Sequence, residues 1–202
     1  MEKELHSMIK TFDFYFDFSS PYTYLAHKEI QKIEIENSIK INYKPILLGG
    51  ILKLAGIKAN VDIPIKGKYM IRDCKLISKK KKINFIFNSN FPIMTLNLMR
   101  FVLIAEKMGF AKKFIKKIFE SIWSDDLNLN DQIVVKKILN SFDINIQNFL
   151  NESSQLIIKN ELKKRTDEAH KKGVFGVPTF IVNNKLFWGQ DRLEFALEEA
   201  KI

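Results

Sequence analysis

A hydroxyl group is predicted at the start of a helix, directly after an apolar strand. Phe14, Phe16 and Phe18 alternate with Tyr and Asp, which is the periodicity of a β-strand. Ser20 then takes the position of a helix N-cap and Pro21 the first helical position, where the missing N–H of proline costs nothing. Backbone N–H groups at a helix start attract anions. Ser20 therefore either caps the helix or places its hydroxyl beside a bound anion.

Three further segments carry groups that could bind an extended ligand. Val177-Pro178 precedes an apolar run, and a cis bond there would leave the N–H and C=O groups of Val177 free. Gln190 and Asp191 precede the last helix, where a carboxylate can cap the helix or bind an ammonium group. Lys66 precedes another helix and is either a surface residue or a cation for a ligand.

The net charge of +10 over 202 residues is compatible with nucleic acid, a membrane surface or an anionic ligand. The run Lys79–Lys82 is typical of a solvated helix end, and no nucleic-acid motif accompanies it. No window reaches the ~18 uninterrupted apolar residues of a membrane span. We expect a cytoplasmic protein that binds a small carboxylate rather than nucleic acid or membrane.

Cysteine and histidine usage limits the chemistry further. Cys74 is the single cysteine, so an intrachain disulfide and a multi-cysteine metal site are excluded, and we expect Cys74 to be a buried small residue. His6, His27 and His170 stand apart at positions that look exposed and form no recognisable Ser–His–acid set. We expect neither a metal site nor hydrolase chemistry.

The predicted elements divide the chain into three blocks. Residues 50–170 look wholly helical, with helix starts at Asp131 and Asn145. The apolar runs around Asn183-Asn184 predict a hairpin. The other predicted elements are a strand at 11–18, a helix at 22–35, strands at 39–45, 179–182 and 185–188, and a helix at 191–200.

This order, β-α-β, a helical insertion and then β-β-α, is that of a thioredoxin-like α/β fold. The fold would be interrupted by a large all-helical insertion. We place the thioredoxin-like domain at residues 11–48 and 172–202 and the insertion at residues 49–171.

Together these segments resemble 2-hydroxychromene-2-carboxylate isomerases and the related kappa-class glutathione transferases of the DsbA-like thioredoxin superfamily. The resemblance extends from Phe14 to Leu197. The motifs that carry it are Asp17-x-x-Ser20-Pro21-Tyr22, Gly176-Val177-Pro178-Thr179-Phe180 and Trp188-Gly189-Gln190-Asp191-Arg192.

The resemblance implies that glutathione is the cofactor. Ser20 matches the serine whose hydroxyl hydrogen-bonds the glutathione sulfur and favours the thiolate. This agrees with physics, because helix N-termini lower the pKa of thiols. Val177, before Pro178, matches the residue whose backbone pairs with the cysteinyl part of the tripeptide.

The resemblance also assigns the two ends of glutathione. Gln190 and Asp191 match the pair that holds the γ-glutamyl end, with Asp191 facing the α-ammonium group. Lys66 matches a lysine near the glycyl carboxylate. At the junction where thiol oxidoreductases carry Cys-x-x-Cys, residues 20–23 read Ser-Pro-Tyr-Thr, so dithiol exchange is impossible.

The implied reaction is the isomerisation of an unsaturated aromatic 2-oxo acid, with Tyr22 and Lys53 as candidate substrate contacts. One departure affects the substrate more than the cofactor: Ile57 follows Gly56 where relatives commonly carry Asn. Two alternatives stay open, namely a kappa-class-like transferase or peroxidase and a non-catalytic basic binding module. The resemblance also implies a homodimer.

Overall fold

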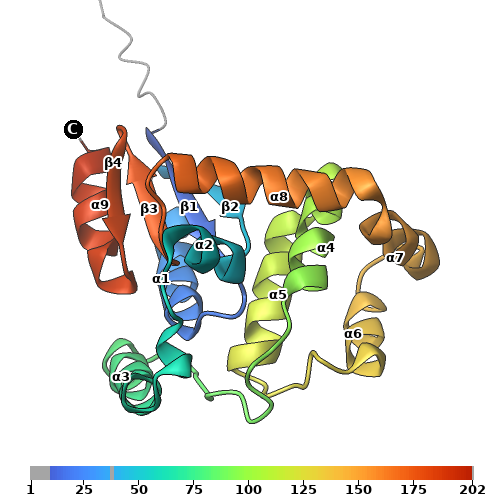
Figure 1. Ribbon diagram of the computed structural model, residues 1–202, viewed down its shortest axis with the longest axis horizontal. Helices are drawn as coiled ribbons and strands as arrows, with labels where there is room; N and C mark the ends of the chain where they lie inside the picture. The colour runs from blue at the N-terminus through green and yellow to red at the C-terminus, as the bar shows by residue number, and fades with distance from the viewer. Residues whose placement is uncertain (1–9, 37–38, 202) are drawn as a thin grey trace, which may run out of the picture.

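The computed structural model describes residues 10–36 and 39–201, which include a four-stranded sheet in the order β2-β1-β3-β4 (Figure 1). Strand β1 pairs in parallel with β2 and antiparallel with β3, and β3 pairs antiparallel with β4. The predicted thioredoxin-like fold, with its β-α-β and β-β-α units, is confirmed. The strands are β1 (Lys10–Phe16), β2 (Ile39–Pro45), β3 (Thr179–Val182) and β4 (Lys185–Trp188).

Helices cover the sheet and form most of the middle of the chain. The helices that contact the sheet include α1 (Pro21–Glu36), α4 (Leu96–Lys107), α8 (Leu156–Lys171) and α9 (Leu193–Ala200), and α2 (Leu48–Ala55) packs on α8. The other described helices are α3 (Pro64–Lys81), α5 (Ala111–Trp123), α6 (Gln132–Leu139) and α7 (Ile146–Ser154), with short 3-10 turns η1 (Asn60–Asp62) and η2 (Gln190–Arg192).

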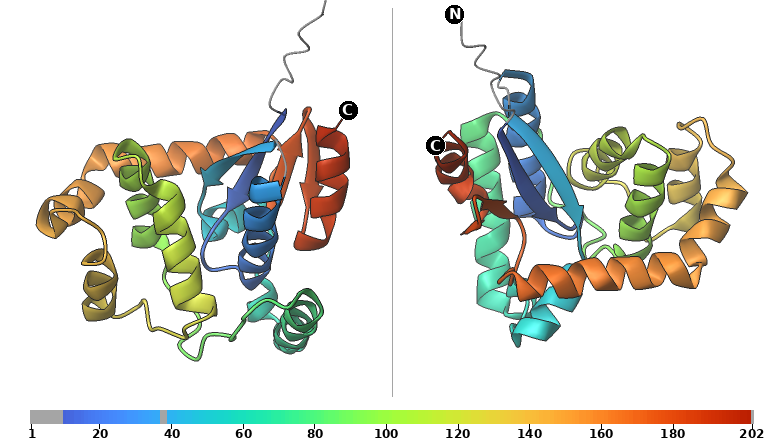
Figure 2. Two further views of the ribbon diagram at one scale, coloured as in Figure 1. Left: turned by 180° about the vertical axis from the view of Figure 1, so that it is seen from behind. Right: turned by 90° about the horizontal axis from the view of Figure 1, so that it is seen from above.

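Strand β1 separates two buried clusters because successive side chains of a strand point to opposite faces. Phe14 and Phe16 belong to the larger cluster, with residues of α1, α5 and α9. Tyr15 belongs to a smaller cluster with residues of α2 and α8. From above, the sheet accordingly lies between α8 on one side and α1 with α9 on the other (Figure 2).

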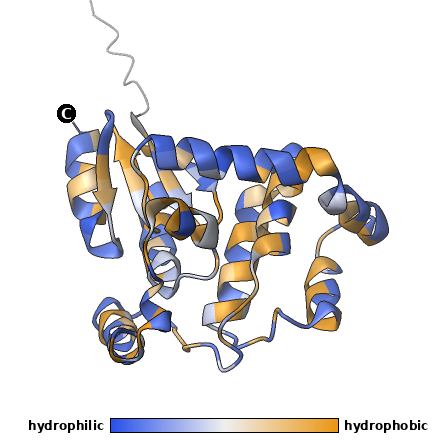
Figure 3. Ribbon diagram, viewed as in Figure 1, coloured by the Kyte–Doolittle hydropathy of each residue, from blue (hydrophilic) through white to orange (hydrophobic). Residues whose placement is uncertain are grey.

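The helical insertion shares its core with the sheet. The larger cluster continues through α4 and α5, and the indole Nε1 of Trp123 donates a hydrogen bond of 2.9 Å to the carbonyl of Phe18. Helix α8 returns the chain to β3, and hydrophilic residues cover most of its length (Figure 3). The domain boundaries at residues 49 and 171 stay a prediction.

Helix starts predicted from single polar residues are confirmed. The side chain of Asp131 accepts the N–H of Ile133 at 2.8 Å at the start of α6. The side chain of Asn145 accepts the N–H of Asn148 at 3.0 Å at the start of α7. Each bond satisfies a backbone donor that has no intrahelical partner.

The prediction that residues 50–170 are wholly helical is wrong for residues 82–95, which form no regular element. This segment bonds to the end of α5 instead: the N–H of Ile86 donates to the carbonyl of Trp123 at 2.7 Å. The side-chain amide of Asn88 donates to the carbonyls of Ile122 and Leu127. These tertiary bonds replace those that a helix would have supplied.

Two predicted boundaries also differ from the structure. Strand β1 ends at Phe16 rather than at residue 18, because the Asp17 side chain accepts the Ser19 N–H and turns the chain. Helix α9 begins at Leu193 rather than at Asp191, because Gln190–Arg192 forms the η2 turn. Asp191 is therefore not the N-cap of α9.

None of the described helices combines the length and the apolar character needed to cross a membrane. Within the same described ranges, no three His, Cys, Asp or Glu side chains are grouped so that they could hold a metal ion.

The expected exposure of His27 is wrong, whereas His170 is half-buried and His6 lies outside the described residues. The His27 side chain is 2% exposed and stacks on Phe119 at 4.9 Å between ring centroids. Neither ring nitrogen has a hydrogen-bond partner in the described part of the chain. Burial lowers the pKa of His27 to about 3.

This burial predicts a pH-dependent stability. Unfolded His27 has a pKa of about 6.5, so between that pH and about 3 the unfolded state binds a proton that the folded state does not. This residue therefore lowers the free energy of unfolding as pH falls, by about 1.4 kcal/mol per pH unit. Urea unfolding of the wild type and His27→Phe at several pH values should show a steeper acid loss in the wild type; parallel curves would contradict this.

Candidate active site

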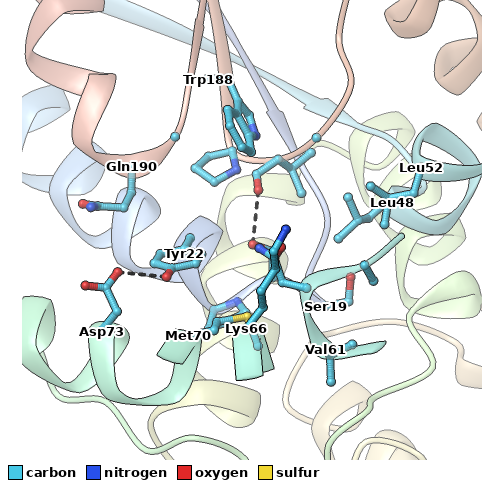
Figure 4. Close-up of a pocket in the computed structure, with 18 of the residues that line it drawn as sticks. Ser19, Tyr22, Leu48, Leu52, Val61, Lys66, Met70, Asp73, Trp188 and Gln190 are labelled. Carbon is cyan, nitrogen blue, oxygen red and sulfur yellow. Dashed lines mark hydrogen bonds between the residues drawn. The ribbon is translucent and has the colours of Figure 1, made fainter. Parts of the chain in front are cut away.

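A pocket of about 880 Å³ opens where the start of α1 meets α2, α3 and the loops around β3 and β4 (Figure 4). The predicted site residues that line it are Ser20, Tyr22, Lys66, Val177, Pro178, Gln190 and Asp191. Lys53, which was predicted as a substrate contact, does not line the pocket, although Lys58 does.

Ser20 is buried at the start of α1, and its hydroxyl makes two hydrogen bonds. Its Oγ accepts the N–H of Thr23 at 3.2 Å, as expected of an N-cap. The same hydroxyl donates to the carbonyl of Val177 at 3.3 Å. That distance is long for an O–H···O bond, so the Ser20 hydroxyl can donate its hydrogen bond to a stronger acceptor in the pocket instead.

Ser19 differs from Ser20 because the Ser19 hydroxyl donates its hydrogen bond to a carboxylate. The Ser19 hydroxyl donates to Asp17 at 3.0 Å, and bonds to a charged acceptor are stronger than bonds to a carbonyl. Of the two adjacent serines, Ser20 therefore has the hydroxyl that is easier to redirect toward a ligand.

Asp17 is a buried carboxylate that joins three parts of the chain. It accepts both the N–H and the hydroxyl of Ser19, the first N–H of α2 at Leu48 (2.8 Å) and the hydroxyl of Thr95 (2.7 Å). Burial raises the pKa of Asp17, and these four donors lower it in part. The carboxylate also lies at the positive end of α2, whose own N-cap residue supplies no side-chain hydrogen bond.

The Val177–Pro178 peptide bond is cis, as the sequence analysis considered. The Val177 carbonyl faces Ser20, and no hydrogen bond of the Val177 N–H to another described residue occurs. One donor and one acceptor of Val177 therefore line the pocket, where an extended peptide-like ligand could pair with them.

Two glycines allow the loops around Val177 to pack closely. A Cβ on Gly176 would lie 2.7 Å from Nε1 of Trp188. Gly189 has φ of +111°, and a Cβ there would lie 2.6 Å from Oδ1 of Asp191. The Gly189 N–H donates to the Pro178 carbonyl at 2.9 Å, which fixes the segment carrying Gln190 and Asp191 against the cis-proline loop.

Tyr22 forms a contact that sequence reasoning missed. Its hydroxyl donates to Oδ2 of Asp73 at 2.8 Å, and both residues line the pocket (Figure 4). Desolvation and this hydrogen bond raise the pKa of Tyr22, so the phenol stays protonated. Asp73 follows Lys66 by seven residues in α3, which places both on one helix face; that spacing was a usable signal.

The charged residues that line the pocket differ in their partners. Asp73 accepts the Tyr22 hydroxyl, and Arg192 is paired with Asp191 at 2.8 Å. Lys58 and Lys66 line the pocket, and neither has an ion-pair partner in the described ranges. Two ammonium groups are therefore available to ligand carboxylates.

Cys74 lies in α3 and is fully buried, as predicted. Burial raises the pKa of its thiol to about 12, so the thiol is neutral at physiological pH. Since the chain has one cysteine, a nucleophilic sulfur in this pocket would have to come from a ligand.

Residues 11–201 match the family model of the DSBA-like thioredoxin domain, so the chain belongs to that family. Its curated relatives include 2-hydroxychromene-2-carboxylate isomerase of Sphingobium xenophagum, with 28% identity over 93% of this chain and 96% of the relative. Glutathione S-transferase kappa 1 of Rattus norvegicus shares 26% identity over 92% of this chain and 88% of the relative.

Solved structures agree with this fold. A structure of 2-hydroxychromene-2-carboxylate isomerase superposes with a TM-score of 0.85 at 24% identity, over 95% of this chain and 94% of that one. A probable DsbA oxidoreductase of Streptomyces coelicolor reaches a TM-score of 0.72 at 12% identity, over 95% and 88% of the two chains.

The Asp17 network predicts a graded loss of stability. Asp17→Ala leaves the donors of Ser19, Leu48 and Thr95 without their acceptor, and should lower the free energy of unfolding by about 3–5 kcal/mol. Thr95→Val removes one donor and should cost about 1–2 kcal/mol. Urea denaturation measures both; equal losses for the two variants would contradict the network.

Proposed function

We propose that the protein is a glutathione-dependent isomerase of unsaturated aromatic 2-oxo acids of the 2-hydroxychromene-2-carboxylate type. The observation that carries this proposal is the Ser20 hydroxyl at the start of α1, 3.3 Å from the backbone carbonyl of Val177 in the pocket. Relatives named as 2-hydroxychromene-2-carboxylate isomerases from Sphingobium and Pseudomonas match over 93% or more of the chain and support the choice.

The groups in the pocket fit glutathione. The tripeptide carries a thiol, peptide groups, two carboxylates and an ammonium group. The pocket offers the Ser20 hydroxyl, the backbone of Val177, the ammonium of Lys66 and the carboxylate of Asp191. Each type of ligand group therefore has a complementary partner, and bound glutathione would supply a thiol that adds reversibly to an electron-poor carbon.

Ser20 would hold the sulfur as a thiolate. Its proton is bonded only weakly to the Val177 carbonyl, so the hydroxyl can turn toward a negative sulfur while its Oγ keeps capping Thr23. The first N–H groups of α1 add a positive field at the same place. Both effects favour the thiolate over the thiol.

The rest of the chain would orient the tripeptide. The free N–H and the carbonyl of Val177 would pair with its cysteinyl part. Gln190 and Asp191 would hold the γ-glutamyl end, which requires Asp191 to share its carboxylate between Arg192 and the ammonium group. Lys66, unpaired in the described ranges, would hold the glycyl carboxylate.

A kappa-class-like transferase or peroxidase is the second candidate, supported by the match to Glutathione S-transferase kappa 1 from rat and human. Because the same site residues would serve each reaction, the products are what distinguish the two candidates. An isomer formed without net consumption of glutathione supports the isomerase, whereas a conjugate or oxidised glutathione supports the alternative. The cytoplasmic location and the homodimer stay predictions.

Ser20→Ala tests the thiolate role. Losing a hydrogen bond to a charged group, worth about 1.5–3 kcal/mol, should raise the pKa of bound glutathione by about 1–2 units. Turnover should fall roughly 10- to 100-fold. Ultraviolet thiolate absorption of the bound cofactor measures the pKa directly. Ser20→Thr retains a hydroxyl and should restore much of both properties; an unchanged pKa in Ser20→Ala would refute the role.

Lys66→Gln tests the cofactor's glycyl end. Loss of one exposed ion pair, about 1 kcal/mol, should weaken glutathione binding about five-fold, measured by calorimetry at low salt. Lys68→Gln is the matched control, because Lys68 is an exposed residue of the same helix that does not line the pocket. Equal effects of both substitutions would indicate a general charge effect instead of a contact.

A further inference from the structure

The pocket that Ser20 lines has two chemically different sides. On one side stand Tyr22, Asp73 and Gln190, which are polar (Figure 4). On the other stand Leu48, Leu52 and Val61, from α2 and η1. The groups assigned above to the γ-glutamyl end of glutathione belong to the polar side, so the opposite side is left for another molecule.

The second side is an apolar ledge, defined by Leu48, Leu52, Ile57 and Val61. All four line the pocket, yet Ile57 is 44% and Val61 41% exposed. The Ile57 N–H donates to the Leu52 carbonyl at 2.9 Å, which places Ile57 beside Leu52. Single exposed apolar residues are ordinary, but several apolar side chains that line one pocket are typical of a ligand contact. The ledge therefore favours the apolar body of a ligand.

Lys58 gives this side one positive charge. It directly follows Ile57, lines the pocket and has no ion-pair partner within the described residues. Lys66 is assigned to the cofactor, so Lys58 is the pocket ammonium that remains. Lys53, the contact expected from the sequence, lies outside the lining.

We propose that the apolar ledge binds the aromatic body of the second substrate and that Lys58 binds its carboxylate. A molecule held at both ends would place its intervening carbons beside Ser20, where the sulfur is expected. Ile57 and Lys58 are then the residues that select an apolar electrophile with one anionic end. This inference rests on the proposed function, since Ser20 defines where the reaction occurs.

Direct binding tests this without turnover. The acid 2-oxo-4-phenylbutanoate has no carbon–carbon double bond conjugated to its carbonyl, so it cannot be isomerised and, in the absence of glutathione, probes the subsite by binding alone. Calorimetry of the full-length protein should show that Lys58→Gln weakens its binding about five-fold. The neutral ketone 4-phenylbutan-2-one, which lacks the carboxylate, should bind the wild type and Lys58→Gln alike.

The ledge is tested with a matched apolar pair. Ile57→Asn should weaken the binding of both probes by about five-fold, because it removes apolar contact area. Leu54→Asn is the control: Leu54 is 47% exposed on the same segment but does not line the pocket, and binding should be unchanged. Lys53→Gln is the matched control for Lys58→Gln, because Lys53 does not line the pocket, and it should leave binding of the acid unchanged.

Three outcomes would overturn the proposal: no binding of the acid to the wild type, no effect of Lys58→Gln, or an equal loss in Lys53→Gln. Glutathione binding by Lys58→Gln and Ile57→Asn should match the wild type. If the probe results fail while glutathione still binds, only the subsite is wrong. If glutathione does not bind the wild type, the proposed function itself is wrong.

Discussion

The buried carboxylate of Asp17 is the constraint on which the pocket depends. Its four hydrogen bonds join the end of β1, the start of α2 and Thr95, which precedes α4. A charge without these donors would be costly to bury. Two of the bonded residues, Ser19 and Leu48, line the pocket, so Asp17 fixes the turn before Ser20 to the start of α2.

Local sequence signals predicted the elements that frame the site. The alternating phenylalanines of β1, the Ser-Pro pair at α1 and the Asn-Asn hairpin each specify a structure within a few residues. The sequence left the isomer of the Val177–Pro178 bond open, because few X-Pro bonds are cis, and the structure shows that it is cis. The resemblance of the motifs to a known family then implied that Ser20, Val177 and Asp191 share one ligand site, and all three line one pocket.

Contacts between distant segments were not predictable in the same way. The Tyr22–Asp73 bond spans 51 residues. The spacing from Lys66 could have placed Asp73 on the pocket face of α3, but no local pattern identifies it as the partner of Tyr22. His27 is polar, and only the packing of α1 on Phe119 shows that it is buried. Lys58 lines the pocket and Lys53 does not, and this difference depends on the path of the chain after α2.

The absence of cysteine from the strand–helix junction has a consequence for regulation. Residues 20–23 contain no sulfur, and the thiol of Cys74 is buried and neutral. Oxidants and alkylating reagents act on exposed thiolates, and this chain offers them none. A change in the redox balance therefore acts on no thiolate of this chain, and reactive sulfur would reach the pocket with the molecules that enter it.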